Sequence, residues 1–226
     1  MTIADDVPAP RFIGSSDDVL SASDDVLCAS IVLASASMTR RMLLEGAGVP
    51  HIVEPSRVDE DEIKISLRAE RASGTDIAEV LAEAKAMYVS RKHPEKMVLG
   101  ADQVLECDGE TFDKPVDRDD ALSQLQTLRG KRHSLISYAV ISRGGQRIWQ
   151  AVDRATLEIR ADASDAFFNA YLDAAVDDAF NGPGAYRIES LGAQLFSRVE
   201  GSHFTILGLP MLALLDYLRA NGVLRT

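Results

Sequence analysis

The stretch SIVLASASMTRRMLLEGAG, residues 30–48, contains the pattern on which the fold prediction rests. Its first five residues form a short apolar run that includes the β-branched Ile31 and Val32, and the polar segment SAS follows. Met38, Leu43 and Leu44 then recur before the glycines at 46 and 48. This order predicts a strand, a loop and a helix, in that sequence.

The same alternation continues along the chain. Residues 76–92 have apolar side chains at helical spacing, and MVLGA (97–101) is a candidate buried strand with Asp102 at its end. Further expected elements are a helix capped by Asp117 and stopped by Gly130, a hairpin of strands 133–142 and 147–160, helices over 164–176 and 210–222, and mostly extended chain over 193–210. This mixed order predicts an α/β sheet with helices on both sides.

Composition and charge limit the possible partners. The chain has 226 residues, 46% of them hydrophobic, and a net charge of −11. Non-specific binding to a nucleic-acid polymer or to an anionic membrane is therefore not expected, and a bound phosphate needs a local cationic pocket. The two cysteines, Cys28 and Cys107, form no metal motif and suggest a reducing compartment. Without a membrane-spanning run or an export signal, we expect a cytoplasmic protein.

Residues 1–29 differ from the rest. They contain six aspartates and a single cation, Arg11, among Ser, Ala and Pro, and the tetrapeptide DDVL occurs twice. This composition predicts a disordered acidic tail before one folded domain, residues 30–226. A wrongly chosen start codon and a short amphipathic helix that docks on the body are the alternatives.

The loop before the first predicted helix is a candidate anion site. Free backbone N–H groups at a helix start attract anions, and the hydroxyls of Ser35 and Ser37 can add donors. Arg40 and Arg41 lie in the first turn, where the helix dipole disfavours cations unless an anion is present. The alternative is that Ser37 is only an N-cap and that both arginines are solvated.

A second group of candidates surrounds Asp102. A carboxylate at the end of a buried strand can hold Mg²⁺ or deprotonate a water molecule, and Lys114 before Pro115 can bind phosphate. Residues 58–60 supply acidic ligands for a hard cation, although residues 59–62 also resemble a solvated acidic loop. The alternatives are that Asp102 is a turn former or a helix cap, and that Lys85 is a lysine that extends from the edge of an apolar stripe to solvent.

A third region is rich in glycine. Residues 184–190 are followed by Gly201 and by the segment LGLP at 207–210. Such glycines suit the close approach of a ligand, but they also suit ordinary turns.

Five collinear motifs resemble one known family. The segments LASASMTRRMLLEGAGVPHIVEPSRVDE, AEAKA, VLGADQVLECDGETFDKPVDRDDALSQLQTLRGKRH, GAYRIESLGAQLF and EGSHFTILGLP are similar, in order and spacing, to the Maf-like nucleoside triphosphate pyrophosphatases, also called septum formation inhibitor proteins. The resemblance implies a two-lobed, inosine triphosphatase-like α/β fold, with a mixed sheet, flanking helices and a central cleft. It also implies a homodimer that hydrolyses nucleoside triphosphates to the monophosphate and pyrophosphate with a divalent metal, Mg²⁺ or Mn²⁺.

The resemblance assigns roles to individual residues. Asp102 matches the family's proton acceptor, and Glu60 with Asp102 would form the metal environment. The positions that match phosphate contacts are Ser37, Arg40, Lys85 and Lys114.

Departures from the family pattern bear on the substrate. The usual Ser-Pro-Arg-Arg is Ser37-Met38-Thr39-Arg40 here, which leaves Arg41 as a shifted cation. Thr39, Gln103 and Glu189 occupy the family's specificity positions, and a Gln with a Glu resembles the branch that acts on 7-methyl-GTP rather than dTTP and UTP. A carboxylate can accept hydrogen bonds from guanine and favours the positive charge of the methylated ring.

Other functions remain as alternatives. One is a pyrophosphatase that prefers dTTP and UTP or has broad specificity. Another is a regulator of cell division that responds to nucleotides without hydrolysing them. A dinucleotide-binding domain is poorly supported, because the sequence has neither GxGxxG nor a P-loop motif.

Overall fold

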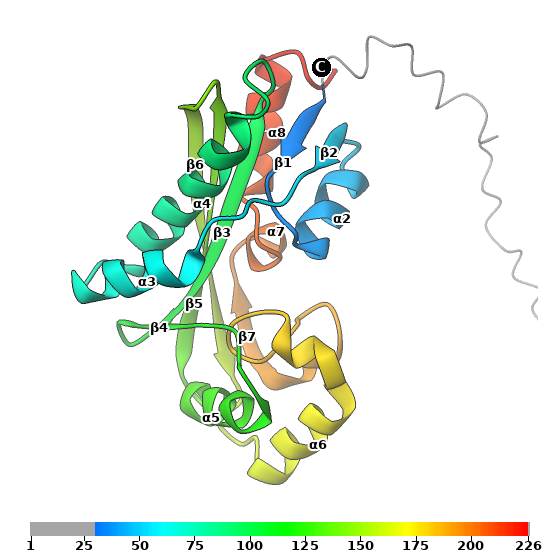
Figure 1. Ribbon diagram of the computed structural model, residues 1–226. Helices are drawn as coiled ribbons and strands as arrows, with labels where there is room; N and C mark the ends of the chain where they lie inside the picture. Colours follow the sequence, from blue (N-terminus) through cyan, green and yellow to red (C-terminus); the bar gives the residue numbers. More distant parts are fainter. Residues whose placement is uncertain (1–29, 226) are drawn as a thin grey trace, which may run out of the picture.

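The computed structural model describes residues 30–225, and the predicted tail, residues 1–29, lies outside the described part of the chain. One mixed sheet of seven strands has helices on both faces, as the sequence pattern predicts (Figure 1). Its strand order is β2-β1-β3-β5-β6-β7, with β4 paired to β3. The strands are β1 (Ile31–Leu33), β2 (His51–Val53), β3 (Val98–Cys107), β4 (Glu110–Phe112), β5 (Arg132–Arg143), β6 (Gln146–Ile159) and β7 (Phe196–Glu200).

Most helices begin at a side-chain cap. Ser37, Asp59, Ser73, Asp117 and Ser164 each accept a hydrogen bond from a backbone N–H three residues later. The α-helices are α2 (Met38–Gly46), α3 (Glu60–Ala69), α4 (Gly74–Ser90), α5 (Arg118–Leu128), α6 (Asp165–Ala175), α7 (His203–Ile206) and α8 (Met211–Ala220), and two 3₁₀ helices are η1 (Val176–Phe180) and η2 (Leu191–Leu195). Every helix within residues 30–225 is too short or too polar to span a lipid bilayer. The homodimer and the cytoplasmic location stay predictions.

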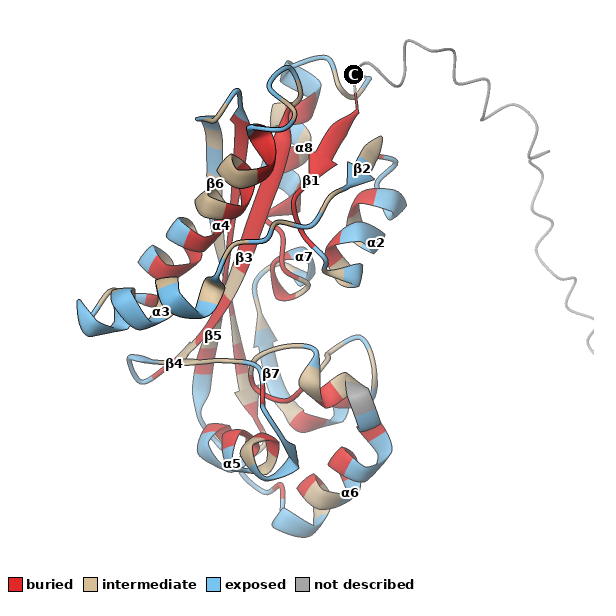
Figure 2. Ribbon diagram, in the orientation of Figure 1, coloured by how far each residue is buried: buried red, intermediate tan, exposed pale blue. Residues whose placement is uncertain are grey.

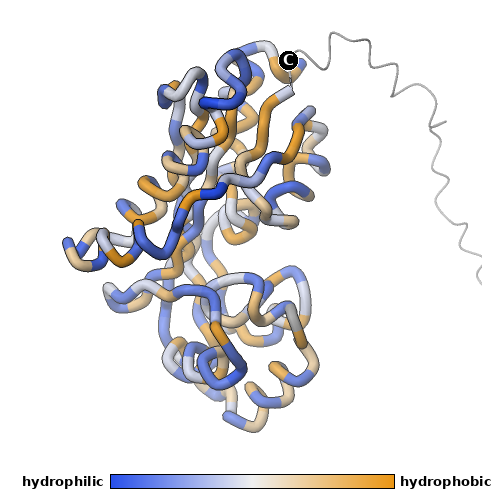
Figure 3. Tube along the Cα trace, viewed as in Figure 1, coloured by the Kyte–Doolittle hydropathy of each residue, from blue (hydrophilic) through white to orange (hydrophobic). Residues whose placement is uncertain are grey.

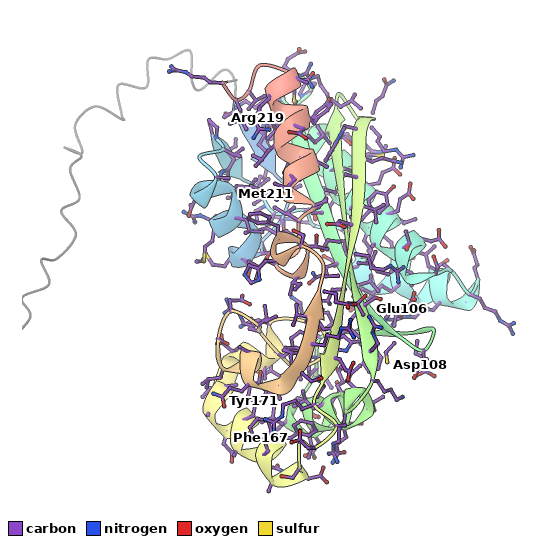
Figure 4. All side chains as sticks on the ribbon, turned by 180° about the vertical axis from the view of Figure 1, so that it is seen from behind. Glu106, Asp108, Phe167, Tyr171, Met211 and Arg219 are labelled. Atoms are coloured by element: carbon purple, nitrogen blue, oxygen red, sulfur yellow. The ribbon has the colours of Figure 1, made fainter. Side chains whose placement is uncertain are left out.

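Two lobes share the long strands β3, β5 and β6 (Figure 1). In one lobe, Ile31, Leu99 and Leu214 belong to a core formed by β1, β3 and α8, and the trace of β1 is strongly hydrophobic in Figure 3. In the other lobe, Leu157 and Phe168 belong to a separate core beneath α5 and α6. Figure 2 shows the buried residues of each lobe, and Figure 4 labels Met211 and Arg219 on α8 and Phe167 and Tyr171 on α6, at opposite ends of the molecule.

One edge of β3 is only partly paired. On its other edge, β3 pairs with β5 from Val98 to Glu106 without a break. On this edge, β1 pairs with β3 at Val98 and Leu99, and β4 pairs with it from Leu105 to Cys107. Among the described residues, no strand therefore pairs with this edge between Gly100 and Val104. The backbone and side chains near Asp102 are left open to a cavity.

The alternation of side chains along β3 decides what faces α4. Val104 belongs to the hydrophobic cluster of α4, whereas Leu99 and Ala101 belong to the core beneath α8. Gly100 and Asp102 share the face of Val104, because side chains two residues apart in a strand point the same way. Asp102 therefore faces α4, and Gly100 lets the backbones of α4 and β3 approach closely.

Two sequence-based expectations and one alternative interpretation are wrong. The strand predicted over 97–101 continues to Cys107, so Asp102 lies inside β3 and not at its end. Residues 59–62 are not an acidic loop: they begin α3, with Asp59 as its N-cap. Residues 193–210 are not mostly extended, because η2 and α7 flank the short strand β7. The helix over 76–92, the helix after Asp117, the hairpin and the two later helices are confirmed.

Replacement of Gly100 by Ala tests the contact between α4 and β3. A Cβ atom at this position would lie 2.2 Å from the backbone oxygen of Ala82 and 2.6 Å from the backbone nitrogen of Ala86. Because backbone cannot move aside like a side-chain end, we expect Gly100→Ala to lower the free energy of unfolding by about 3 kcal/mol. Urea unfolding measures this change.

Gly46→Ala is the matched control. A Cβ at Gly46, the last residue of α2, would meet nothing within 4 Å. We expect this variant to be as stable as the parent chain or more stable by up to about 1 kcal/mol. Equal stability of both variants would contradict the close approach at Gly100.

Candidate active site

A cavity of about 460 Å³ opens beside the unpaired edge of β3. Segments from both lobes line it, including the start of α2, one face of α3, α4, β3 and the loops at 181–189 and 206–208. Almost all the residues predicted from the sequence meet here: Ser35, Ser37, Thr39, Arg40, Glu60, Lys85, Asp102, Gln103, Lys114 and Glu189. The separate segments of the chain thus converge on one site.

Lys85 and Asp102 form a buried ion pair in this cavity. Their exposed fractions are 6% and 7%, and Lys85 Nζ lies 2.6 Å from Asp102 Oδ1. Lys85 also lies 2.9 Å from Glu60 Oε2 on α3. Lys85 is on the buried side of α4, so it does not extend to solvent as the alternative interpretation proposed. One lysine therefore holds two carboxylates from two different elements.

Arg40 is the buried cation at the start of α2. Its Nε donates to the backbone oxygen of Gly208 at 2.9 Å, and its Nη1 donates to Ser35 Oγ at 3.2 Å. Burial lowers the pKa of Arg40, whereas the charges of Asp102 and Glu60 act in the opposite direction. Ser37 is the N-cap of the helix and accepts from the backbone N–H of Arg40.

Arg41 lies outside the cavity. It is half exposed, and its Nε lies 2.7 Å from Glu45 Oε1 on the same helix. The structure therefore separates the two neighbouring arginines that the sequence grouped together. Of the two arginines, only Arg40 lines the cavity together with Asp102, and Arg41 does not occupy the place of a shifted cation.

Sequence reasoning missed a cluster on α3. Lys64 and Arg68 follow Glu60 at intervals of four residues and line the cavity with it. Lys64 Nζ lies 2.9 Å from Asp113 Oδ1, and Arg68 Nη1 lies 2.7 Å from Asp113 Oδ2. The i, i+4 spacing was the available signal, but it is visible only when residues 60–69 are recognised as a helix.

The cluster shifts the pKa values of its members. Burial alone would lower the pKa of Lys64, but its hydrogen bond to Asp113 and the charges of Asp113, Asp102 and Glu60 outweigh this effect and raise it. Burial alone would raise the pKa of Asp113, but Arg68 and Lys64 lower it. Lys64 therefore stays cationic while it lies within the electrostatic reach of Asp102.

Two of the predicted specificity residues have structural partners. The amide nitrogen of Gln103 donates to the backbone oxygens of Thr205 (2.8 Å) and Ile206 (3.0 Å), and to Ser137 Oγ at 3.1 Å. Glu189 Oε1 accepts two hydrogen bonds from Arg187, at 3.0 Å and 2.9 Å. Both side chains are fixed, and the remaining oxygen of each is an acceptor.

The acidic groups suit a metal that also binds substrate. In the described part of the chain, no cluster of three or more His, Cys, Asp or Glu side chains forms a complete metal site. Glu60 and Asp102 nevertheless share Lys85 as a partner, so their carboxylates lie close together. Mg²⁺ typically takes one or two carboxylates and completes its shell with water and substrate phosphates. The donor set fits that mode of binding.

The lining of the cavity is cationic although the whole chain is acidic. The net charge of the protein is −11. Around the cavity, cationic side chains outnumber anionic ones: the cations are Arg40, Lys64, Arg68, Lys85, Lys114 and Arg187, and the anions are Glu60, Asp102, Asp113 and Glu189. Such a local excess attracts polyanions into the cavity.

The chain is similar to known proteins over nearly all of its described length. A family model described as "Maf-like protein" matches residues 30–221. The chain is 48% identical over 193 residues to a protein of Paramagnetospirillum magneticum. This alignment covers 85% of the present chain and 99% of the relative. The chain is 48% identical over 194 residues to a protein of a Ruegeria species (86% and 97% covered), and 44% identical over 194 residues to one of Caulobacter vibrioides (86% and 96% covered).

All three relatives have the name nucleoside triphosphate pyrophosphatase. The matched region begins one residue before β1 and includes every segment that lines the cavity. On the strength of this match, the chain belongs to the Maf-like protein family.

Proposed function

We propose that this protein hydrolyses nucleoside triphosphates between the α- and β-phosphates and releases the monophosphate and pyrophosphate. The observation that carries the proposal is the Lys85–Asp102 pair, buried in a cationic cavity at the open edge of β3. The relatives named nucleoside triphosphate pyrophosphatase support the same activity.

The cavity supplies charge for the triphosphate. The N-terminus of α2 presents backbone N–H groups next to the hydroxyls of Ser35 and Ser37. Arg40 on α2, Lys85 on α4 and Lys114 in the loop after β4 add positive charge from three separate segments. These groups are oriented before the reaction starts, so little reorganisation is needed when negative charge develops on the leaving pyrophosphate.

Asp102 is the proposed general base. Lys85 binds its Oδ1, and its second oxygen has no hydrogen-bond partner among the described residues, so it can accept a proton from water. That water attacks the α-phosphorus, and the bond to the bridging oxygen breaks as pyrophosphate leaves. Glu60 and Asp102 would hold a divalent cation, Mg²⁺ or Mn²⁺, which when bound supplies positive charge against the phosphates.

Within this activity we propose a preference for 7-methyl-GTP. The amide nitrogen of Gln103 is engaged, and the reverse orientation would place its oxygen against two carbonyl oxygens. Gln103 can therefore offer only an acceptor, as Glu189 does. Two acceptors suit guanine, whose N1–H and N2–H₂ groups are adjacent donors, and the charge of Glu189 favours a methylated, positive ring.

Asp102→Asn tests the catalytic role. We expect pyrophosphate release with Mg²⁺ or Mn²⁺ to fall at least about 100-fold, because the amide cannot accept the proton of the attacking water. The measurement follows pyrophosphate and orthophosphate separately over a panel of nucleotides. Asp216→Asn, which alters an exposed partner of Arg219, is the control. Unchanged turnover in Asp102→Asn, or release of orthophosphate by the parent chain, would refute the proposal.

Replacement of Arg40 should change KM for the triphosphate much more than replacement of Arg41. We expect Arg40→Gln to raise KM for the triphosphate about tenfold or more, because a buried charge that faces the cavity is lost. We expect Arg41→Gln to change KM less than about twofold, because its partner is Glu45 outside the cavity. Steady-state kinetics and thermal unfolding of both variants are the measurements. Equal effects on KM would contradict the placement of Arg40 at the phosphates.

Glu189→Gln tests the base preference. We expect the parent chain to have a higher kcat/KM for 7-methyl-GTP than for dTTP or UTP. In Glu189→Gln, we expect the ratio of kcat/KM for 7-methyl-GTP to kcat/KM for dTTP or UTP to fall about tenfold, because a neutral amide replaces a charged acceptor. Glu200→Gln, which alters an exposed partner of Arg132, is the control. A parent chain that prefers dTTP or UTP would overturn the 7-methyl-GTP assignment and leave the pyrophosphatase proposal intact.

A further inference from the structure

The cations of α3 have no role in the mechanism above. Lys64 and Arg68 lie on the cavity-facing side of the helix, one and two turns after Glu60. No residue of α3 is fully buried, although Ile63 and Leu67 pack against the cluster beneath α4. The hydrophobic core therefore does not require a lysine and an arginine at these two positions.

Both cations share one carboxylate. Asp113 receives Lys64 on Oδ1 and Arg68 on Oδ2, and Arg68 Nε also donates to Thr111 Oγ1 at 3.2 Å. One negative charge thus faces two positive charges, so the cluster has an unbalanced positive charge. The side chain of Asp113 is 44% exposed, and water or another anion can reach the same cations.

The cluster adjoins the proposed catalytic groups. Asp113 immediately precedes Lys114, which also lines the cavity, and Glu60 at the other end of the stripe binds Lys85. A polyphosphate bound near Asp102 with one end toward Lys114 would therefore meet Lys64 and Arg68. An arginine fork and a lysine ammonium are the groups that proteins use for phosphate oxygens.

We propose that Lys64 and Arg68 are a binding subsite for the pyrophosphate part of the substrate and for the pyrophosphate product, and that Asp113 neutralises them in its absence. This inference rests on the proposed pyrophosphatase function. Phosphate oxygens replace the carboxylate as partners of the two cations, and no covalent bond changes. Asp113 then prevents two unpaired cations from facing each other in the empty cavity, and it competes with the anion.

Calorimetric titration of the full chain with inorganic pyrophosphate in the presence of Mg²⁺ tests the subsite. We expect the double variant Lys64→Met, Arg68→Met to bind pyrophosphate at least tenfold more weakly than the parent chain. Its affinity for GMP should change less than twofold, because a monophosphate lacks the leaving group. The control, Lys92→Met with Arg219→Met, removes the same two residue types from surface ion pairs with Glu54 and Asp216 and should not alter either affinity.

Asp113→Asn separates binding from a purely structural role. If Lys64 and Arg68 bind pyrophosphate, removal of the competing charge leaves its affinity unchanged or raises it. If the two cations only anchor the segment that carries Lys114, Asp113→Asn weakens pyrophosphate binding as much as the double variant does, and the inference is wrong. Equal losses of pyrophosphate and GMP affinity in the double variant would also overturn it.

The two proposals fail in different ways. Release of orthophosphate by the parent chain would refute the pyrophosphatase function. Normal pyrophosphate release, together with unchanged pyrophosphate affinity in the double variant, would refute only the subsite.

Discussion

The incomplete pairing of one edge of β3 is the constraint on which the site depends. β1 leaves this edge after Leu99, and β4 joins it only at Leu105, while β5 holds the opposite edge throughout. Pairing with β5 therefore holds the backbone of β3 in place where its side chains face the cavity. A catalytic group on such a strand is positioned more firmly than one on a loop. The break in pairing also coincides with the junction of the two hydrophobic cores.

The burial of Lys85 depends on its two carboxylate partners, Glu60 and Asp102. An isolated ammonium group in the interior is very costly, and two carboxylates from α3 and β3 offset that cost. In the same arrangement, the positive charge of Lys85 lies between the negative charges of Glu60 and Asp102, in the cavity that the N-terminus of α2 also lines. Gly100 permits it, because α4 can then approach β3 closely enough for Lys85 to meet Asp102.

The segment 205–208, which includes the end of α7 and the turn after it, is fixed from two sides. Gln103 donates to the backbone oxygens of Thr205 and Ile206, and Arg40 donates to that of Gly208. Strand β3 and helix α2 are therefore tied to one short segment near the C-terminus. Gln103 and Arg40, which the family resemblance assigns to substrate binding, therefore also position a segment that lines the cavity. For variants of either residue, both the free energy of unfolding and the kinetic constants should be measured.

The sequence alone predicted the order of most elements, and nearly all the site residues that it named meet in the cavity, but it did not point to Lys64 or Arg68. Apolar periodicity and end signals such as Asp117 are local, so helices such as α4 and α5 were predictable, and collinear motifs identified Asp102, Lys85 and Lys114. Only the tertiary structure separated Arg40 from Arg41, because adjacent helical residues point in different directions and packing decides which one is buried. Only the tertiary structure shows that β3 extends past Asp102 and that Lys64 and Arg68 bind Asp113. Strand pairing, and ion pairs between residues more than 40 positions apart, leave no local pattern in the sequence.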